Sequence, residues 1–174
     1  MSIAALMDFA ARRPRTVFLG LALWCVALLL FGLYLQHVQG LEPCPMCIVQ
    51  RYALMGVAVL ALALAAGQGW RWHRWGSVAV VLVAGFGAVT AARQSWLQWF
   101  PPEVFSCGRG FYGMIESFPM RRAIPMIFRG SGDCTQTDWT FLGLSIPNWS
   151  FLNFSAMVAG AIVLWLALGR RRPA

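Results

Sequence analysis

The sequence predicts an all-α membrane protein: a bundle of four transmembrane helices with a long extracytoplasmic loop between the third and the fourth. Of its 174 residues, 59% are hydrophobic and only 11% are charged, which does not fit a water-soluble domain. Four nearly uncharged segments reach about 20 residues, the length that crosses a hydrocarbon core of roughly 30 Å. They are residues 17–36, 48–66, 76–96 and 150–169. Inside lipid each segment must satisfy its own backbone hydrogen bonds, so each must be a helix.

The first two spans can be justified from their flanking residues. Span 17–36 is too long for the apolar part of a signal peptide and lacks a small-residue cleavage site, so we expect it to remain as an anchor. Span 48–66 is preceded by Pro43 and Pro45, which suit the first turn of a helix. The second helix is therefore predicted to begin at Cys44 or just after it.

The last two spans, 76–96 and 150–169, are flanked by tryptophans of the kind that mark membrane interfaces. These are Trp70, Trp72 and Trp75 on the predicted inner side, and Trp96, Trp99, Trp139 and Trp149 on the outer side. We expect one membrane domain over residues 1–174, with outer loops at about 37–47 and 97–149.

The arginines predict the orientation. The formal charge is +8, and eight of the 14 basic residues, all Arg, flank one side of the spans. They are Arg12, Arg13, Arg15, Arg71, Arg74, Arg170, Arg171 and Arg172. Long loops such as 97–149 weigh little in the positive-inside rule, so both termini are predicted to be cytoplasmic. This distribution favours the lipid bilayer and its anionic headgroups as partner and argues against nucleic acid.

Four of the five cysteines are then predicted to face the opposite, oxidising side. Cys44 and Cys47 end the first outer loop, Cys107 and Cys134 lie in the second, and Cys25 is expected to be a small apolar filler within the first span. An even count of cysteines in such a compartment favours two disulfides. The CxxC spacing favours pairing Cys44 with Cys47, which would leave Cys107 with Cys134, but four cysteines allow three connectivities.

The CxxC motif is predicted to be reactive. Cys47 falls in the first turn of the second helix, where free N–H groups and the helix dipole favour a thiolate. Arg51 lies one turn deeper on the same face, within reach of the Cys47 sulfur or of an oxygen bound beside it. A membrane Arg is costly without a partner, although it could snorkel to the headgroups. An inert structural disulfide is the other alternative, but so short a loop gains little stability from crosslinking.

A zinc site is a further alternative for four thiols. Structural zinc sites usually present two closely spaced pairs of cysteines. Cys107 and Cys134 are 27 residues apart, so no metal site is predicted. A disulfide between them, in a long accessible loop, would instead be of the exchangeable kind.

These residues together resemble the DsbB family of bacterial inner-membrane disulfide-bond-formation proteins, over essentially the whole chain. The matching stretches are Gln36-His37-Val38, Glu42-Pro43-Cys44-Pro45-Met46-Cys47, Gln50-Arg51, Ser131-Gly132-Asp133-Cys134, Trp139, Phe141-Leu142-Gly143-Leu144 and Pro147-Asn148-Trp149. A lone CxxC is a weak signal. The CxxC, the Arg four residues later and the GDC motif are specific in combination.

The resemblance implies a thiol oxidoreductase that reoxidises a periplasmic DsbA-like thioredoxin-fold protein and passes the electrons to a membrane quinone, ubiquinone or menaquinone. Cys107 would take the attack from the partner, Cys134 would be its companion, and Cys134 would then exchange with Cys44. Cys47 would meet the quinone, whose oxygen Arg51 would hold. The implied location is the bacterial inner membrane, with the redox cysteines facing the periplasm.

One departure from the family concerns the outer end of the third span. Some members place a His there, whereas this chain reads Arg93-Gln94-Ser95. Gln94 can hydrogen-bond a quinone carbonyl but cannot titrate near neutral pH, so it is a candidate cofactor-binding residue and not a proton donor. His37 is the one His on the predicted outer side, and a loop His is more often solvated or capping.

A quinone also fits the energetics. A DsbA-type oxidant has a potential near about −120 mV, and reoxidising it with a disulfide near −300 mV would cost roughly 8 kcal/mol. A more oxidising acceptor must therefore take the electrons from the cysteines.

Two other functions fit parts of the sequence. A quinone reductase of the vitamin K epoxide reductase type typically carries its membrane CxxC after the loop cysteines, and the order here is the reverse. A non-enzymatic four-span protein with two structural disulfides would not need Arg51 and would bind no quinone.

Overall fold

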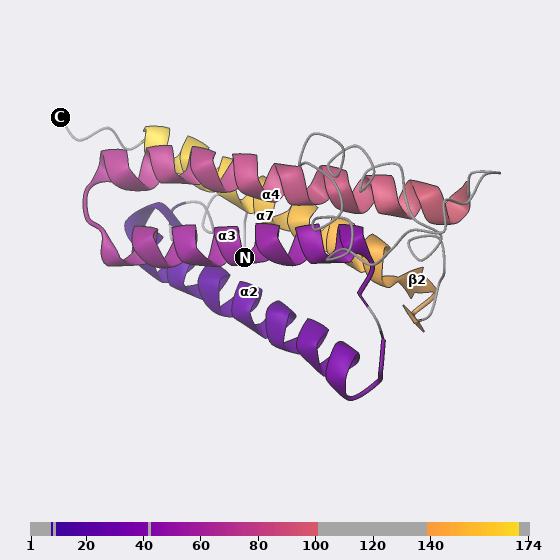
Figure 1. Cartoon of the computed structure of the whole chain (residues 1–174). Helices are drawn as coiled ribbons and strands as arrows, with labels where there is room; N and C mark the ends of the chain where they lie inside the picture. The colour runs from indigo at the N-terminus through magenta and orange to yellow at the C-terminus, as the bar shows by residue number, and fades with distance from the viewer. Residues whose placement is uncertain (1–7, 9, 42, 101–138, 171–174) are drawn as a thin grey trace, which may run out of the picture.

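The computed structural model of the chain describes residue 8 and residues 10–41, 43–100 and 139–170. Its long helices are α2 (Pro14–His37), α3 (Pro45–Ala66), α4 (Trp70–Trp99) and α7 (Ile146–Arg170) (Figure 1). All four are long and apolar enough to cross a membrane, which confirms the predicted fold class. A short hairpin, β1 (Thr140–Phe141) and β2 (Leu144–Ser145), precedes α7 and was not predicted.

The helices extend beyond the apolar segments read from the sequence. Arg71 and Arg74, expected in the connection between the second and third spans, lie instead in the first turns of α4. The turn before α4 is set by Gly69, whose φ of 99° is readily adopted only by glycine. Hydropathy measures the part of a helix inside the hydrocarbon, and the interfacial Trp and Arg residues simply continue the same helix.

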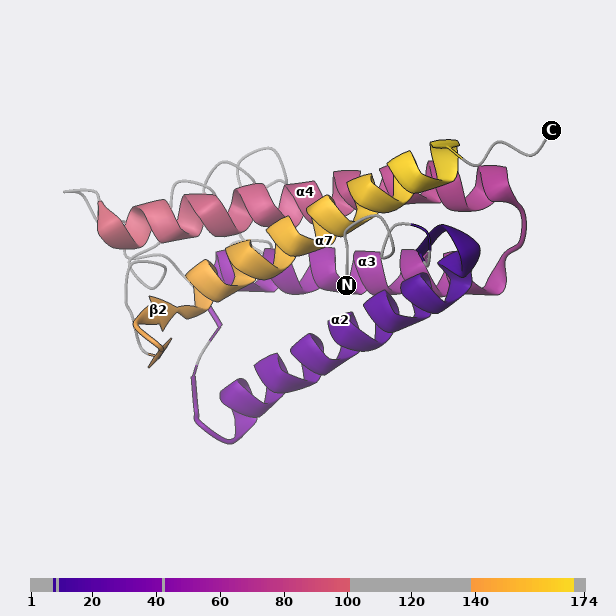
Figure 2. The same ribbon diagram turned by 180° about the vertical axis from the view of Figure 1, so that it is seen from behind.

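The helices pack in chain order around an open side. Close contacts join α2 to α3, α3 to α4, and α4 to α7, whereas α2 and α7 make few. Figures 1 and 2 show α2 diverging from α3 towards the end of the bundle that carries the hairpin. One hydrogen bond crosses the open side, from Trp24 Nε1 on α2 to Asn153 Oδ1 on α7, at 3.2 Å.

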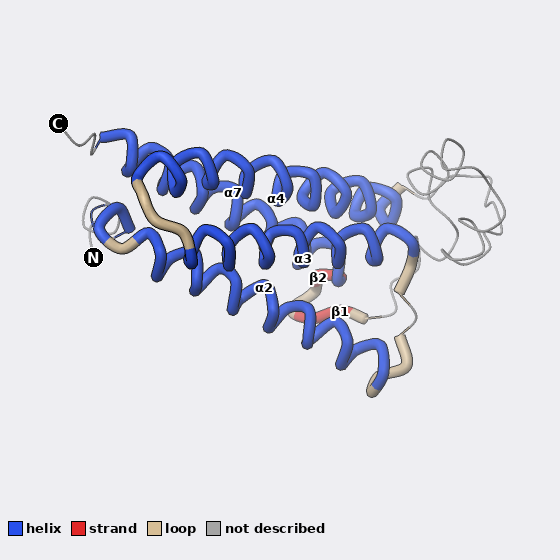
Figure 3. Tube along the Cα trace, turned by 60° about the vertical axis from the view of Figure 1, so that its left-hand side comes forward, coloured by secondary structure: helices blue, strands red, loops and turns tan. Residues whose placement is uncertain are grey.

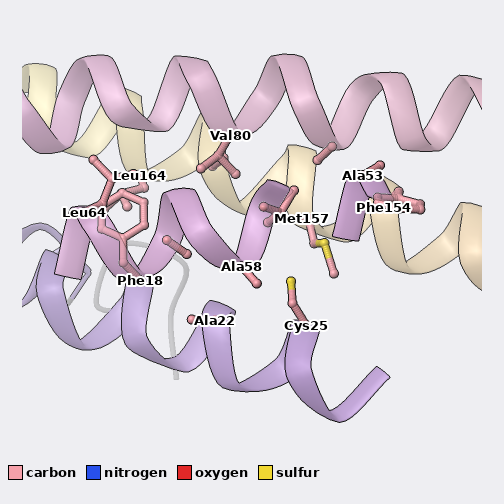
Figure 4. Packing of buried hydrophobic residues seen from close by; sticks show 14 of the residues in the cluster. Phe18, Ala22, Cys25, Ala53, Ala58, Leu64, Val80, Phe154, Met157 and Leu164 are labelled. Atoms are coloured by element: carbon pink, nitrogen blue, oxygen red, sulfur yellow. The ribbon is translucent and has the colours of Figure 1, made fainter. Parts of the chain in front are cut away.

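The core fills the bundle from the end where α2 begins as far as Phe154 of α7, and it uses small residues. Figure 4 shows side chains from all four helices meeting there. Alanines supply much of the α3 contribution, which lets neighbouring helices approach closely, as is usual in membrane bundles. Cys25 is fully buried in this core, at 0% exposed, in agreement with the apolar filler expected from the sequence.

Gly87 on α4 lies directly against the ring of Phe154 on α7. A Cβ atom at this position would meet three ring carbons of Phe154, each nearer than the 3.0 Å that real Cβ contacts respect. Phe154 is only 1% exposed and has little room to move. Gly85, on the same helix, has nothing within 4 Å of the corresponding point.

We predict that Gly87→Ala lowers the free energy of unfolding by about 1–3 kcal/mol, because it overpacks the contact with Phe154. Gly85→Ala, which adds the same methyl group into open space, should leave stability unchanged or slightly higher. Thermal unfolding of the two variants in detergent, followed by circular dichroism, checks this. Equal melting temperatures for both variants would contradict the packing described.

Candidate functional site

The two cysteines of the CxxC motif lie side by side at the start of α3. Cys44 is the N-cap in extended conformation, and its sulfur accepts a hydrogen bond from the backbone N–H of Cys47 at 3.3 Å. The two Sγ atoms are 2.9 Å apart. Cys44 is buried and Cys47 is half-buried. Bond formation or exchange between the sulfurs therefore needs no backbone movement, and the helix N-terminus favours negative charge on them.

Both cysteines line a cavity of about 470 Å³. Its walls come from α2, α3, α4, α7 and the hairpin, and they include Trp24, Leu28, Phe31, Leu54, Trp149 and Phe154. The polar lining is sparse and includes Gln36, Gln50, Arg51 and Gln94. A mostly apolar cavity of this size with a few convergent polar groups is typical of a small-molecule site.

A larger hollow of about 1170 Å³ lies at the opposite end, where α3 meets α4. Its lining includes the interfacial Trp72 and Trp75 together with Arg71, and no cysteine. It lacks redox chemistry, so we place the site at the smaller cavity.

Arg51 bridges α3 to α2 at the edge of this cavity. Its Nη1 donates to Gln36 Oε1 at 2.5 Å and its Nη2 donates to the backbone oxygen of Gly32 at 3.0 Å. These partners offset the cost of a half-buried cation in a membrane helix. The sequence predicted the helical face of Arg51 but not its acceptors, which belong to the preceding helix. Among the described residues, the guanidinium hydrogen-bonds to α2 and not to the cysteine sulfurs.

Gln94 on α4 reaches the cysteine pair. Its Nε2 lies 3.1 Å from Cys44 Sγ and 3.2 Å from Cys47 Sγ. Its Oε1 accepts a hydrogen bond of 2.7 Å from Nε2 of Gln50. The sequence suggested Gln94 as a partner for a quinone carbonyl, and the structure shows its amide facing the sulfurs.

Gln50 is a site residue that the sequence reasoning missed. It was quoted only as part of a family motif, yet it is 5% exposed and lines the cavity. Its position three residues after Cys47, on the same side of a helix, is the signal that could have identified it.

The hairpin forms part of the cavity wall at the end of the bundle where α3 begins. Leu142 and Gly143, with φ of 51° and 76°, form the tight turn between its strands. Trp149 Nε1 donates to the Phe141 backbone oxygen at 3.0 Å, and the ring of Trp139 meets Phe31 of α2 edge-on at 6.1 Å. Figure 3 shows the hairpin beside the C-terminal half of α2. Trp139 and Trp149, which the sequence analysis assigned to an interface, therefore also hold the hairpin against its neighbours.

The remaining predicted site residues are placed differently. Cys107 and Cys134 lie outside the described residues, so their relation to Cys44 and Cys47 stays a prediction. His37 is the last residue of α2, where it is exposed, and it is absent from the cavity lining.

Comparisons with known proteins agree with these features. Residues 14–164 match the family described as disulfide bond formation protein DsbB. The chain is 61% identical over 170 residues to disulfide bond formation protein B of Acidovorax sp. (strain JS42), covering 97% of each chain. It is 65% identical over 159 residues to the protein of that name from Polaromonas sp. (strain JS666 / ATCC BAA-500), covering 91% of this chain and 95% of the relative. For Azoarcus sp. (strain BH72) the identity is 54% over 162 residues, covering 92% and 96%.

We predict that mild oxidation joins Cys44 directly to Cys47, because their sulfurs are already adjacent. In a Cys107→Ser/Cys134→Ser variant, mass mapping of unreduced peptides should find this bond alone.

Cys25 should resist a maleimide until the protein unfolds, because it is fully buried in the core. Recovery of Cys25 crosslinked to either motif cysteine would contradict the arrangement.

Proposed function

The chain belongs to the DsbB family and is a quinone-dependent membrane oxidoreductase that generates protein disulfides, and we propose that the cavity at the start of α3 is its electron-transfer site. In this proposal the enzyme reoxidises a periplasmic DsbA-like thioredoxin-fold protein and delivers the electron pair to ubiquinone or menaquinone. The observation that carries it is the meeting of a sulfur pair, an Arg guanidinium and an apolar cavity within one membrane bundle.

The residues around the cavity fit a quinone. Aromatic and aliphatic side chains accept a hydrophobic ring, and the Cys47 sulfur lines the same space. Arg51 would hold a carbonyl oxygen, because a guanidinium has more N–H donors than its two acceptors on α2 occupy. A bound quinone would supply the two-electron oxidising power that cysteine pairs lack.

The cysteines themselves carry out thiol–disulfide exchange. When a thiolate attacks Cys44 Sγ, a bond forms to that sulfur, the bond between Cys44 and Cys47 breaks, and the electron pair remains on Cys47 Sγ. By resemblance to the family, Cys134 supplies that thiolate after Cys107 has reacted with the partner protein. The N-terminal N–H groups of α3 favour the negative charge that Cys47 receives.

The family match favours this function over the two alternatives. A vitamin K epoxide reductase-like enzyme would have its cysteine motifs in the opposite order, and a purely structural protein would not need a buried polar network at its CxxC motif. The fixed position of Arg51 likewise argues for more than a snorkelling side chain.

We propose that the protein lies in the bacterial inner membrane with both termini in the cytoplasm and Cys44 and Cys47 at the periplasmic end. Alkaline phosphatase fused after Gly40 should then be active, and the same enzyme fused after Gln68 inactive. The reverse pattern would place the sulfurs in a reducing compartment and exclude the proposed reaction.

In a turnover assay with a reduced DsbA-type protein and a short-chain quinone, Cys47→Ser and Cys107→Ser should each abolish reoxidation of the partner. Arg51→Met should raise KM for the quinone by about tenfold or more, because a charge-assisted hydrogen bond is lost. Running ubiquinone and menaquinone analogues in parallel identifies the preferred acceptor.

Arg74→Met is the matched control for Arg51→Met. Arg74 lies at the other end of the bundle, where its guanidinium stacks on the rings of Trp70 and Trp165. The Arg74→Met variant should have the same KM for the quinone as the unsubstituted protein. Normal quinone kinetics in Arg51→Met, or turnover in Cys47→Ser, would refute the assignment of the cavity.

A further inference from the structure

Gln94 faces the motif cysteines in a way that suggests a role in sulfur chemistry. Building on the proposed function, we propose that Gln94 is a catalytic residue whose side-chain amide donates one N–H to each sulfur, and that Gln50 is the positioning residue that fixes this orientation. The reacting sulfurs would thereby share a single donor from the neighbouring helix.

The distances indicate that the Gln94 amide nitrogen donates to both sulfurs. Nε2 of Gln94 is almost equally far from the two sulfurs, at 3.1 Å from Cys44 Sγ and 3.2 Å from Cys47 Sγ. A side-chain amide nitrogen carries two hydrogens, so it can serve both acceptors at once. The amide oxygen accepts a longer hydrogen bond of 3.7 Å from the Cys47 thiol, and this bond is lost when the thiol ionises.

Gln50 determines which end of the Gln94 amide faces the sulfurs. Its Nε2 donates to Gln94 Oε1 at 2.7 Å. Reversing the Gln94 amide would set two NH₂ groups against each other and place a carbonyl oxygen against the sulfur pair. The reversed orientation would therefore be unfavourable both towards Gln50 and towards a thiolate.

Burial makes this hydrogen bond important. Gln94 is 3% exposed and Gln50 is 5% exposed, so water has little access to replace either amide. In a low-dielectric environment a hydrogen bond to a charged acceptor is stronger than in water. A thiolate formed here depends on the donors that the protein provides.

The arrangement suits thiol–disulfide exchange because the negative charge moves from the attacking sulfur to Cys47 Sγ. When an attacking protein thiolate bonds to Cys44 Sγ, the electron pair of the broken bond stays on Cys47 Sγ, and one disulfide replaces another without net oxidation. An N–H of Gln94 already points at the sulfur that becomes negative. In the reverse reaction the Cys47 thiolate attacks Cys44 Sγ and the electron pair leaves with the protein sulfur, so the same N–H serves Cys47 in both directions and no side chain has to rotate.

Gln94 and Arg51 thus have separable tasks. The amide serves the sulfurs, whereas the recorded hydrogen bonds of the guanidinium lead to α2. A loss of the amide should change thiol reactivity even when neither quinone nor partner protein is present. A thiol measurement therefore tests this proposal separately from the proposed function.

The experiment uses the full chain with Cys25→Ala, Cys107→Ser and Cys134→Ser, reduced and stripped of quinone in detergent. The rate of iodoacetamide labelling of Cys47 is measured against pH by mass spectrometry. With Gln94→Met, the half-maximal pH should rise by about one unit, equivalent to roughly tenfold less thiolate at a given pH. With Gln50→Met it should rise by less.

Gln98→Met is the matched control, because Gln98 also lines the cavity, one turn further along α4, where its amide oxygen accepts from Ser145 Oγ at 2.6 Å. Its labelling profile should not move. The double variant Gln50→Met/Gln94→Met should shift no further than Gln94→Met, because Gln50 acts through Gln94.

Three results would overturn the proposal. An unchanged profile in a folded Gln94→Met protein would remove the donor role. An equal shift in Gln98→Met would show a general packing effect, and additive shifts in the double variant would remove the positioning role of Gln50.

Discussion

A polar side chain inside a bilayer has no water to bind, and the end of this bundle where α3 begins is organised by that constraint. Arg51 finds its acceptors on α2, and Gln50 and Gln94 form a buried chain that ends at two sulfurs. Each of these bonds joins one helix to another. The groups that suit the site to chemistry are therefore the same groups that join α2, α3 and α4 at the cysteine end of the bundle.

This organisation places different chemistry on the two sides of the cysteine pair. On the α4 side, the neutral amide of Gln94 donates to both sulfurs. On the α2 side, the Arg51 guanidinium is held at the edge of the cavity by two oxygens of α2. A neutral amide donor stabilises a thiolate without adding a charge to the site. A guanidinium can stabilise an oxygen that becomes negative.

Much of the fold could be predicted from the sequence because its determinants are local. Apolar length defines the spans, and Pro43 and Pro45 indicate where α3 begins. The partners of the site residues could not be predicted in this way. Gln50 and Gln94 are 44 positions apart, and Arg51 and Gln36 are 15 apart, so only helix packing brings them together. The Leu142–Gly143 turn was also missed, because its two-residue strands are too short to show a period.

The sparse contact between α2 and α7 has a consequence for how a lipid-soluble molecule would use the cavity. Trp24 and Phe31 line the cavity and yet are 54% and 47% exposed. A molecule with a compact head and a long isoprenoid chain can thus insert its head alone and leave the chain dissolved among the acyl tails. The protein then has to recognise only the head, and it can draw its acceptor from a two-dimensional reservoir without first extracting it from the membrane.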